Sequence, residues 1–326
     1  MFNRRQFVQS AAATSALTPL VSTNAFAETY PDRDIHSICM FPAGSGADIV
    51  VRYFSNKLAE ETNATVIVEN KPGAFGNIAT SYVARAPADG YTIYIAPGSS
   101  VLAAAPSLFK TLNYDPVNDF EHITTLLKVQ FIQIVSGKSP YKTVADLTKA
   151  LKEKGDKGSY GSIANTGLVS SEFYKKAFDL KTVEVKYKEN SAMYVDLLSG
   201  AIDFAHIDPT SVLGQLQDGT FRALSTSSSQ RVAALPDVPS AAEAGIKGLE
   251  IVAWWSLHVP KGTPKPVVDQ LATWFNKITR EDDVKKFLIN LGLDPFPGDS
   301  NLVKELLAKD TKAWAEYVKL ANIPVL

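Results

Sequence analysis

Apolar residues gather in short runs that alternate with stretches in which they recur every four positions. The run Ile35–Phe41 indicates a strand, and a turn of small residues separates it from a helix that Asp48 opens. In that helix Val50, Phe54 and Leu58 fall on one face. Further strands and helices alternate at 65–69, 77–85 and 91–96, with Gly-containing turns between them. This alternation predicts an α/β fold whose mainly parallel sheet is covered by helices on both faces.

A second set of alternating elements begins after Asp119. We expect strands at 120–127, 131–135, 159–162, 182–187, 202–207 and 221–224, and helices at 143–154, 167–178 and 192–198. After the apolar run Ile251–Leu257 the chain is almost wholly helical. The order predicts two lobes: 28–130 in lobe 1, 131–253 in lobe 2, and 254–326 as a helical return to lobe 1. A ligand would lie between the lobes, near the carboxyl ends of the strands.

Residues 1–27 have the three zones of a cleavable export signal. Arg4 and Arg5 form a basic start, an apolar and small-residue stretch follows, and Ala25-Phe26-Ala27 is a small-x-small cleavage site. The segment Asn3–Val8 also resembles a twin-arginine signal; a general-secretion signal is the alternative that the sequence leaves open. We therefore predict an exported, soluble protein of the periplasm.

Charge and cysteine content exclude several classes of partner. The formal net charge is −1, and loss of Arg4 and Arg5 with the signal would take it to −3. This balance gives no reason to expect nucleic acid or an anionic membrane as a partner. Cys39 is the single cysteine, so an intrachain disulfide cannot form, and its apolar surroundings predict a buried thiol. No metal-binding spacing and no complete nucleotide loop occurs, so we expect neither metal nor cofactor.

The turn Ala43–Ala47 allows two chemical interpretations. It lies between a strand and a helix, where a nucleophile elbow would place Ser45, but the outer glycines of that motif are absent. The other interpretation is an anion site, because small residues allow close approach and a helix N-terminus directs amide groups at the ligand. No Lys or Arg lies within 41–47, so amides, the Ser45 hydroxyl and water would hold a carboxylate there. A serine hydrolase based on Ser45 therefore remains an alternative to a receptor.

Several segments in a fixed order resemble the extracytoplasmic solute receptors of tripartite tricarboxylate transporters, also called Bug receptors. The segments are Tyr30–Pro31, Phe41–Asp48, Val68–Gly73, Gly76–Ile78, Ala88–Thr92, Tyr114–Phe120, Tyr160–Ser162, Val185–Lys188, Leu235–Ser240, Glu243–Gly245 and Gly262–Pro264. The resemblance covers the whole mature chain. It implies a two-lobed periplasmic-binding-protein fold (type II) that closes over a small carboxylate and delivers it to two membrane permease subunits. A monomeric receptor without enzyme activity is expected.

The same resemblance implies the binding residues. The family's loops correspond to Phe41, Ala43, Gly44, Ser45, Gly46, Ala47, Asp48 and Asn77 in lobe 1, and to Ser162, Asn165, Thr166 and Asp208 in lobe 2. The first loop departs from the family's usual Pro-Gly-Gly and later Thr, so the contact to the proximal carboxylate is expected to differ in detail. Asp208 either accepts hydrogen bonds from the ligand or caps the helix that follows.

The second-lobe loop, 163–169, is more apolar than the family's usual Gly-Ser-rich loop. If Phe41, Phe75 and Trp254 lie near the cleft, the ligand has an apolar or aromatic body; packing in the lobe cores is the alternative. The expected ligand is thus a di- or tricarboxylate or an aromatic carboxylate. A ligand sensor without transport is a further alternative that the sequence cannot separate from a transport receptor.

Overall fold

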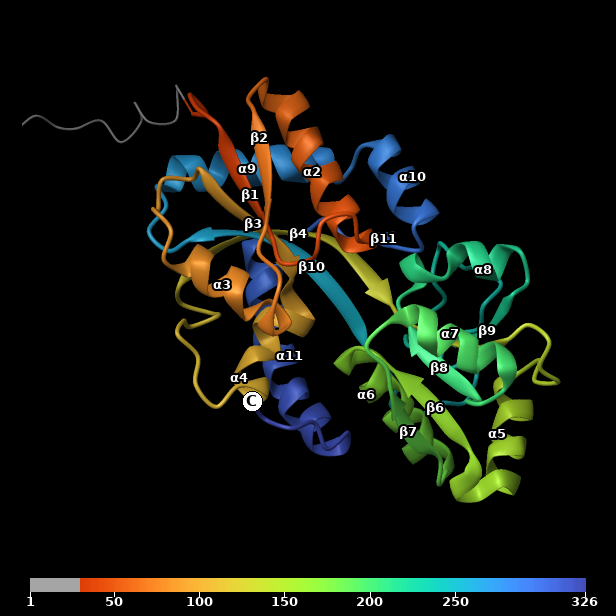
Figure 1. Cartoon of the computed structure of the whole chain (residues 1–326). Helices are drawn as coiled ribbons and strands as arrows, with labels where there is room; N and C mark the ends of the chain where they lie inside the picture. The colour runs from red at the N-terminus through yellow and green to blue at the C-terminus, as the bar shows by residue number, and fades with distance from the viewer. Residues whose placement is uncertain (1–29) are drawn as a thin grey trace, which may run out of the picture.

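The computed structural model describes residues 30–326 and divides them between two sheets (Figure 1). The predicted signal peptide, residues 1–27, lies outside the described residues. One sheet has six strands in the order β11-β4-β10-β3-β1-β2, and the other has five in the order β7-β6-β8-β5-β9. Only β10 and β11 oppose the direction of the first sheet, and only β5 opposes that of the second. The two-lobed α/β fold predicted from the sequence is confirmed.

Lobe 1 contains the six-stranded sheet, with helices on both faces. Its strands are β1 (Ile35–Cys39), β2 (Val66–Asn70), β3 (Thr92–Pro97), β4 (Phe120–Gln130), β10 (Val252–Pro260) and β11 (Asp294–Pro295). Its helices are α2 (Gly46–Thr62), η1 (Ala74–Gly76), α3 (Asn77–Ala84), η2 (Gly98–Ala103), α4 (Ala105–Leu108), α9 (Lys265–Ile278), α10 (Asp282–Asn290) and α11 (Ser300–Leu320). Helices α2, α9 and α10 bury apolar residues on one face, and α3, η2, α4 and α11 on the other.

Lobe 2 contains the five-stranded sheet. Its strands are β5 (Ile132–Ser136), β6 (Ser159–Ser162), β7 (Val183–Lys186), β8 (Phe204–Ile207) and β9 (Phe221–Thr226). Its helices are α5 (Val144–Lys154), η3 (Gly155–Lys157), α6 (Asn165–Phe178), α7 (Asn190–Ser199), η4 (Pro209–Ser211) and α8 (Leu213–Gln217). Helices α5 and α6 bury apolar side chains on one face of the sheet, and α7 does so on the other.

Helix α2 begins before the residue at which the sequence pattern places its start. Its N-cap is Ser45, whose Oγ accepts a hydrogen bond of 3.2 Å from the N–H of Asp48. Asp48 therefore lies in the first turn and is not the N-cap that the sequence analysis expected. A carboxylate in the first turn is favourable because the helix dipole is positive there.

The chain crosses between the lobes on strands that are themselves paired. Strand β4 leads directly to β5 with one residue between them, and β10 returns from lobe 2 antiparallel to β4 along nine registered residue pairs, Val252↔Gln130 to Pro260↔Phe120. Figure 1 shows both strands extending from the larger sheet toward lobe 2. The two crossings thus form one ribbon of paired strands between the lobes.

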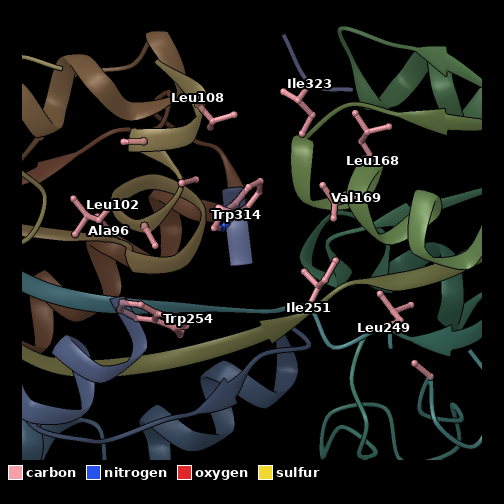
Figure 2. Close-up of a cluster of buried hydrophobic side chains, with 14 of the residues drawn as sticks. Ala96, Leu102, Leu108, Leu168, Val169, Leu249, Ile251, Trp254, Trp314 and Ile323 are labelled. Atoms are coloured by element: carbon pink, nitrogen blue, oxygen red, sulfur yellow. The ribbon is translucent and has the colours of Figure 1, made fainter. Parts of the chain in front are cut away.

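One buried apolar cluster contains residues of both lobes. In Figure 2 Trp254 and Trp314 belong to lobe 1, whereas Leu168 and Val169 come from α6 in lobe 2. Helix α11 also contacts α6, with Phe173 packing edge-on against Tyr317 at 5.5 Å between ring centroids. The lobes are therefore joined by packing as well as by the crossing strands.

Two buried histidines face each other in lobe 1. Nδ1 of His122 on β4 lies 2.8 Å from Nδ1 of His258 on β10. His122 Nε2 donates to the Val117 carbonyl at 3.2 Å, so its Nδ1 accepts from His258. His258 Nε2 in turn accepts from the Ser256 hydroxyl at 2.6 Å. Both rings are neutral in this arrangement.

Over residues 30–326 no helix is long and apolar enough to cross a membrane. Within the same residues no group of three or more His, Cys, Asp and Glu side chains is placed to hold a metal ion. Cys39, the single thiol, is buried in lobe 1.

Candidate ligand-binding site

A cavity of about 420 Å³ lies between the lobes. Its apolar wall is formed by Phe41, Ala47, Pro97, Val129, Phe131, Ile163, Ala164, Met193, Ile207, Ala253 and Trp255. Its polar lining residues are Ser100, Thr166, Asn190, His206, Asp208, Thr210 and Ser211. Among these lining residues only His206 and Asp208 are titratable, and none is Lys or Arg. The cavity is thus largely apolar and lacks a fixed cation.

Asp48 holds the loop at the N-terminus of α2 in one conformation. Its carboxylate accepts hydrogen bonds from the Gly44 N–H at 2.8 Å, Arg52 Nε at 2.8 Å and Asn70 Nδ2 at 2.6 Å. Asn70 also donates to the Phe41 carbonyl at 2.9 Å. Burial acts to raise the pKa of Asp48, but the hydrogen bonds from Arg52, Asn70 and Gly44 outweigh it and hold the pKa below its usual value. The structure therefore places Asp48 behind the loop, where it positions the amides.

Two amides of this loop have no acceptor within the described part of the chain. The N–H groups of Gly46 and Ala47 begin α2, ahead of the first hydrogen bond of the helix ladder, and Ala47 lines the cavity. Gly46 also marks the contact between lobes, since a Cβ at this position would lie 3.4 Å from Thr210 Oγ1 of lobe 2. Unpaired amides at a helix N-terminus form an anion-binding site.

Lobe 2 presents a second helix N-terminus to the same cavity. Helix α6 has no side-chain cap, and the N–H groups of Asn165, Thr166 and Gly167 have no acceptor among residues 30–326. Thr166 lines the cavity. Gly167 is required here, because a Cβ would lie 2.4 Å from the carbonyl oxygen of His206 on β8. This close approach brings the start of α6 against the end of the strand that carries His206.

His206 lies near the end of β8, and Asp208 is the first residue after that strand. His206 is buried, and its Nδ1 lies 2.9 Å from Ser171 Oγ. Burial lowers the pKa of His206 to about 3, so the ring is neutral. Asp208 Oδ1 accepts hydrogen bonds from the Thr210 N–H at 2.8 Å and the Thr210 hydroxyl at 2.7 Å, which makes it the N-cap of η4. Burial raises the pKa of Asp208, against the hydrogen bonds from Thr210.

An aromatic pair forms part of the wall in lobe 1. The rings of Phe41 and Trp255 are stacked at 5.4 Å between centroids and 10° between planes, and both residues line the cavity. Trp254, the neighbouring residue on β10, points to the other face of the strand, where it is buried and its Nε1 donates to Asp310 at 2.8 Å.

The remaining predicted site residues lie apart from this cavity. Ser162 and Asn165 line a smaller cavity of about 220 Å³ that also contains Phe75 and the C-terminal Leu326. Ser162 donates to Glu184 at 2.5 Å. Asn77 lies in a surface depression with Ile78 and Tyr82. The cavities share Ile163 and Ala164, so the loop before α6 separates them.

The hydrolase alternative has no support in the geometry. Within the described residues the only hydrogen bond of Ser45 Oγ comes from the N–H of Asp48. The histidines are bonded elsewhere: His36 to Glu69, His122 to His258, and His206 to Ser171. Ser45 therefore has no base to activate it.

Several lining residues were missed by the sequence analysis, chiefly Ser100, Asn190, Met193, His206 and Trp255. They come from η2, α7, β8 and β10, and none belongs to a local motif. For His206 a signal existed: it is two residues before Asp208, so both side chains fall on the same side of the strand end.

Comparisons with known proteins give matches over most of the chain. The model of the family described as "Tripartite tricarboxylate transporter family receptor" matches residues 50–323. A relative from Cupriavidus necator, the UPF0065 protein in the gbd 5' region, is 30% identical over 329 residues that cover 98% of this chain and 99% of the relative. Protein BugT of Bordetella pertussis is 27% identical, with 94% of each chain covered.

Two solved structures are similar over most of the chain. "R. palustris Rpa4515 with adipate" has a TM-score of 0.80 and 29% identity, covering 91% of this chain and 100% of that one. "Structure of periplasmic binding protein BugD" has a TM-score of 0.76 and 30% identity, covering 90% of this chain and 99% of that one.

Proposed function

The chain belongs to the receptor family of tripartite tricarboxylate transporters, and on that premise we propose that it captures an organic carboxylate in the periplasm and delivers it to the permease subunits of such a transporter. Members of this family are solute-binding receptors, not enzymes. Export is supported by the signal-like residues 1–27. The ligand class and the transporter partner are the parts of the function that we propose.

The observation that supports carboxylate binding is the meeting of two helix N-termini at one apolar cavity. Ala47 of α2 lines the cavity from lobe 1 and Thr166 of α6 lines it from lobe 2, and neither amide has an acceptor within residues 30–326. Each helix end carries a partial positive charge of roughly half a unit, and several unpaired N–H groups point out of it. A carboxylate between them would be bound by both lobes, which couples binding to closure.

A solved relative supports the same ligand class. The relative that is 29% identical is described with adipate, which is an apolar chain with carboxylates at its ends. The apolar wall here, including the Phe41–Trp255 pair, provides a surface for such a body. An aliphatic or aromatic carboxylate therefore suits the cavity better than one covered with hydroxyl groups.

A thermal-shift screen of the protein without residues 1–27 tests the proposal. The panel contains acetate, benzoate, adipate, malate and citrate. A ligand at 100 times its Kd stabilises the folded state by about 2.7 kcal/mol, which is readily seen as a rise in Tm. If no carboxylate raises the Tm at saturating concentration, the proposed function is wrong.

A proline substitution locates the binding groups. Ala47→Pro removes one unpaired amide at the second position of α2, a position at which α9 naturally carries Pro266. Loss of one charge-assisted hydrogen bond should weaken carboxylate binding roughly tenfold or more. Asn301→Pro, at the second position of α11 and away from the cavity, is the matched control. Equal losses in both variants would show that the Ala47 amide is not a binding group.

Uptake separates a transport receptor from a sensor. Cells that have the permease subunits should accumulate labelled ligand only when this receptor is present. Ligand binding without such accumulation would assign the protein to signalling.

A further inference from the structure

Two lining residues at the end of β8 each have a hydrogen-bond acceptor without a described partner. One is Asp208 Oδ2, because the hydrogen bonds from Thr210 both go to Oδ1 and no described donor reaches Oδ2. The other is His206 Nε2, which is buried and has no partner within residues 30–326. Both residues line the cavity, and their i, i+2 spacing places them on the same side of the strand end.

Hydrogen bonds around Ser171 determine the tautomer of His206. Ser171 Oγ lies 3.0 Å from the Gly167 carbonyl and 2.9 Å from His206 Nδ1. A serine hydroxyl has one proton, and in this helix it goes to the carbonyl four residues earlier. Nδ1 of His206 therefore carries the hydrogen and donates to Ser171, which leaves Nε2 with a lone pair. This nitrogen requires a donor.

Charge distinguishes between ligand classes at this site. Helix α7 also begins at the cavity wall, since its first residue, Asn190, lines the cavity. The N-termini of α2, α6 and α7 contribute roughly +0.5 each, or about +1.5 together. Ionised Asp208 and one ligand carboxylate bring −2, so the cavity is close to balance. A second ligand carboxylate would take the sum to about −1.5, with no Lys or Arg among the lining residues to offset it. An ammonium group in its place brings the sum to about +0.5, which is closer to neutral than the sum for the dicarboxylate.

We propose that the preferred ligand combines one carboxylate with a protonated amine, and that Asp208 Oδ2 and His206 Nε2 accept hydrogen bonds from that amine. This inference rests on the proposed function and narrows it from organic carboxylates in general to amino acids with an apolar body. The ammonium satisfies both unpaired acceptors and neutralises Asp208. The carboxylate binds to the helix amides, and the body packs on the Phe41–Trp255 pair.

A series of four ligands with one skeleton tests the inference by calorimetry. The four ligands differ in the group on the carbon next to the carboxylate. That group is an ammonium in phenylalanine, a hydroxyl in phenyllactate, a hydrogen in 3-phenylpropanoate and a second carboxylate in benzylmalonate. A second series places the same groups on a methylene at the far end of the ring: 4-(aminomethyl)benzoate, 4-(hydroxymethyl)benzoate, 4-methylbenzoate and 4-(carboxymethyl)benzoate. In at least one series the ammonium member should bind roughly tenfold or more tightly than the dicarboxylate.

The variant Asp208→Asn keeps an oxygen that can accept from Thr210 but removes the charge. It should lose the preference for the ammonium member and bind the dicarboxylate more tightly than the wild type does. Asp218→Asn is the matched control, because exposed Asp218 accepts from the Thr220 N–H at 2.8 Å in the same i, i+2 arrangement. That variant should keep the wild-type order.

The outcomes separate the inference from the function on which it rests. If adipate or a dicarboxylate of the series binds most tightly, and more so as the pH falls, Asp208 is a protonated donor and the inference is overturned while carboxylate capture stands. An unchanged order in Asp208→Asn also overturns it. If neither the series nor adipate, malate or citrate binds, the proposed function itself fails.

Discussion

The main-chain N–H of Phe131 donates a hydrogen bond of 2.9 Å to the hydroxyl of Ser227. The same hydroxyl donates to the Ile251 carbonyl at 2.6 Å, and the main chain of Ser227 pairs with both residues. Phe131 stands between β4 and β5, and Ile251 precedes β10. One buried serine therefore joins the two segments that cross between the lobes.

Replacing Ser227 by Ala should weaken the hinge. Two main-chain groups lose their shared partner, which costs about 1–3 kcal/mol of unfolding free energy when such groups stay buried. Urea denaturation measures that cost, and small-angle scattering with and without ligand measures closure. Ser55→Ala is the control: Ser55 is equally buried and bonds to Ser37 and Val51, away from the crossing. It should lower stability without changing closure, and identical scattering from both variants would contradict a hinge role.

Gly46→Leu should hold the lobes apart. A Cβ at this position would already be in contact with Thr210 Oγ1 at 3.4 Å, so the longer leucine side chain would push against lobe 2. We expect ligand affinity to fall roughly tenfold or more, since overpacking costs about 1–3 kcal/mol. Gly214→Leu on α8 is the control, because a Cβ at that position meets nothing within 4 Å. Adding Thr210→Ala to Gly46→Leu should restore part of the affinity; no recovery would mean that the loss arises elsewhere.

Trp255 should report ligand binding through its fluorescence. Its ring lines the cavity and stacks on Phe41, whereas Trp254 and Trp314 are buried in the core. Ligand entry therefore changes the surroundings of one indole. Trp255→Phe should abolish most of the ligand-induced signal, and Trp274→Phe on α9 should preserve it. A signal that survives in Trp255→Phe would place the ligand away from this wall.

Acid should destabilise the fold through its buried histidines. Burial lowers the pKa of His122 to about 4 and that of His206 to about 3, and burial also lowers the pKa of His258. In the unfolded chain each histidine takes up a proton near pH 6.5, whereas in the folded chain the buried rings stay neutral at that pH. The contribution of these neutral histidines to the free energy of unfolding is therefore fully present above that pH and falls as the pH decreases toward 4.

The variant His206→Asn removes one of these buried histidines and so measures its contribution to the pH dependence of stability. The pKa of Asp208 is raised by burial, in the opposite direction to that of the histidines. Asp208 is present in both proteins, so its contribution to the pH dependence of stability largely cancels in the comparison. Between pH 6 and 5 the free energy of unfolding should fall less steeply in the variant, by up to about 1.4 kcal/mol per pH unit. Equal slopes from urea titrations would show that His206 is accessible to protons in the folded state.

The strand and helix pattern could be predicted because each element has its own periodicity and end signals. Gly200 ends α7 in the left-handed conformation that glycine adopts readily, and Pro264 precedes the first turn of α9, where proline is favoured. The error at the start of α2 had a local cause: Ser45 and Asp48 are both good capping residues, and only the hydrogen bond between them shows which one is the cap.

The cavity was less accessible to sequence reasoning. Trp254 and Trp255 are adjacent and similar, yet the alternation of a strand sends one into the core and the other to the ligand side. Which of the two tryptophans faces the core depends on how β10 pairs with β3 and β4. Asn190 and His206 join the site from separate elements, so no spacing along the chain connects them.

The return of the chain to lobe 1 has a consequence for biosynthesis. Strand β10, between β3 and β4, and helices α9 to α11 are made after the whole of lobe 2. A ribosome therefore completes lobe 2 while lobe 1 still lacks an inner strand, and domain-by-domain folding from the N-terminus is not open to this chain. Until β10 emerges, β3 and β4 each have an unpaired edge. The nascent receptor has to be kept from aggregating through these edges until that strand has been synthesised.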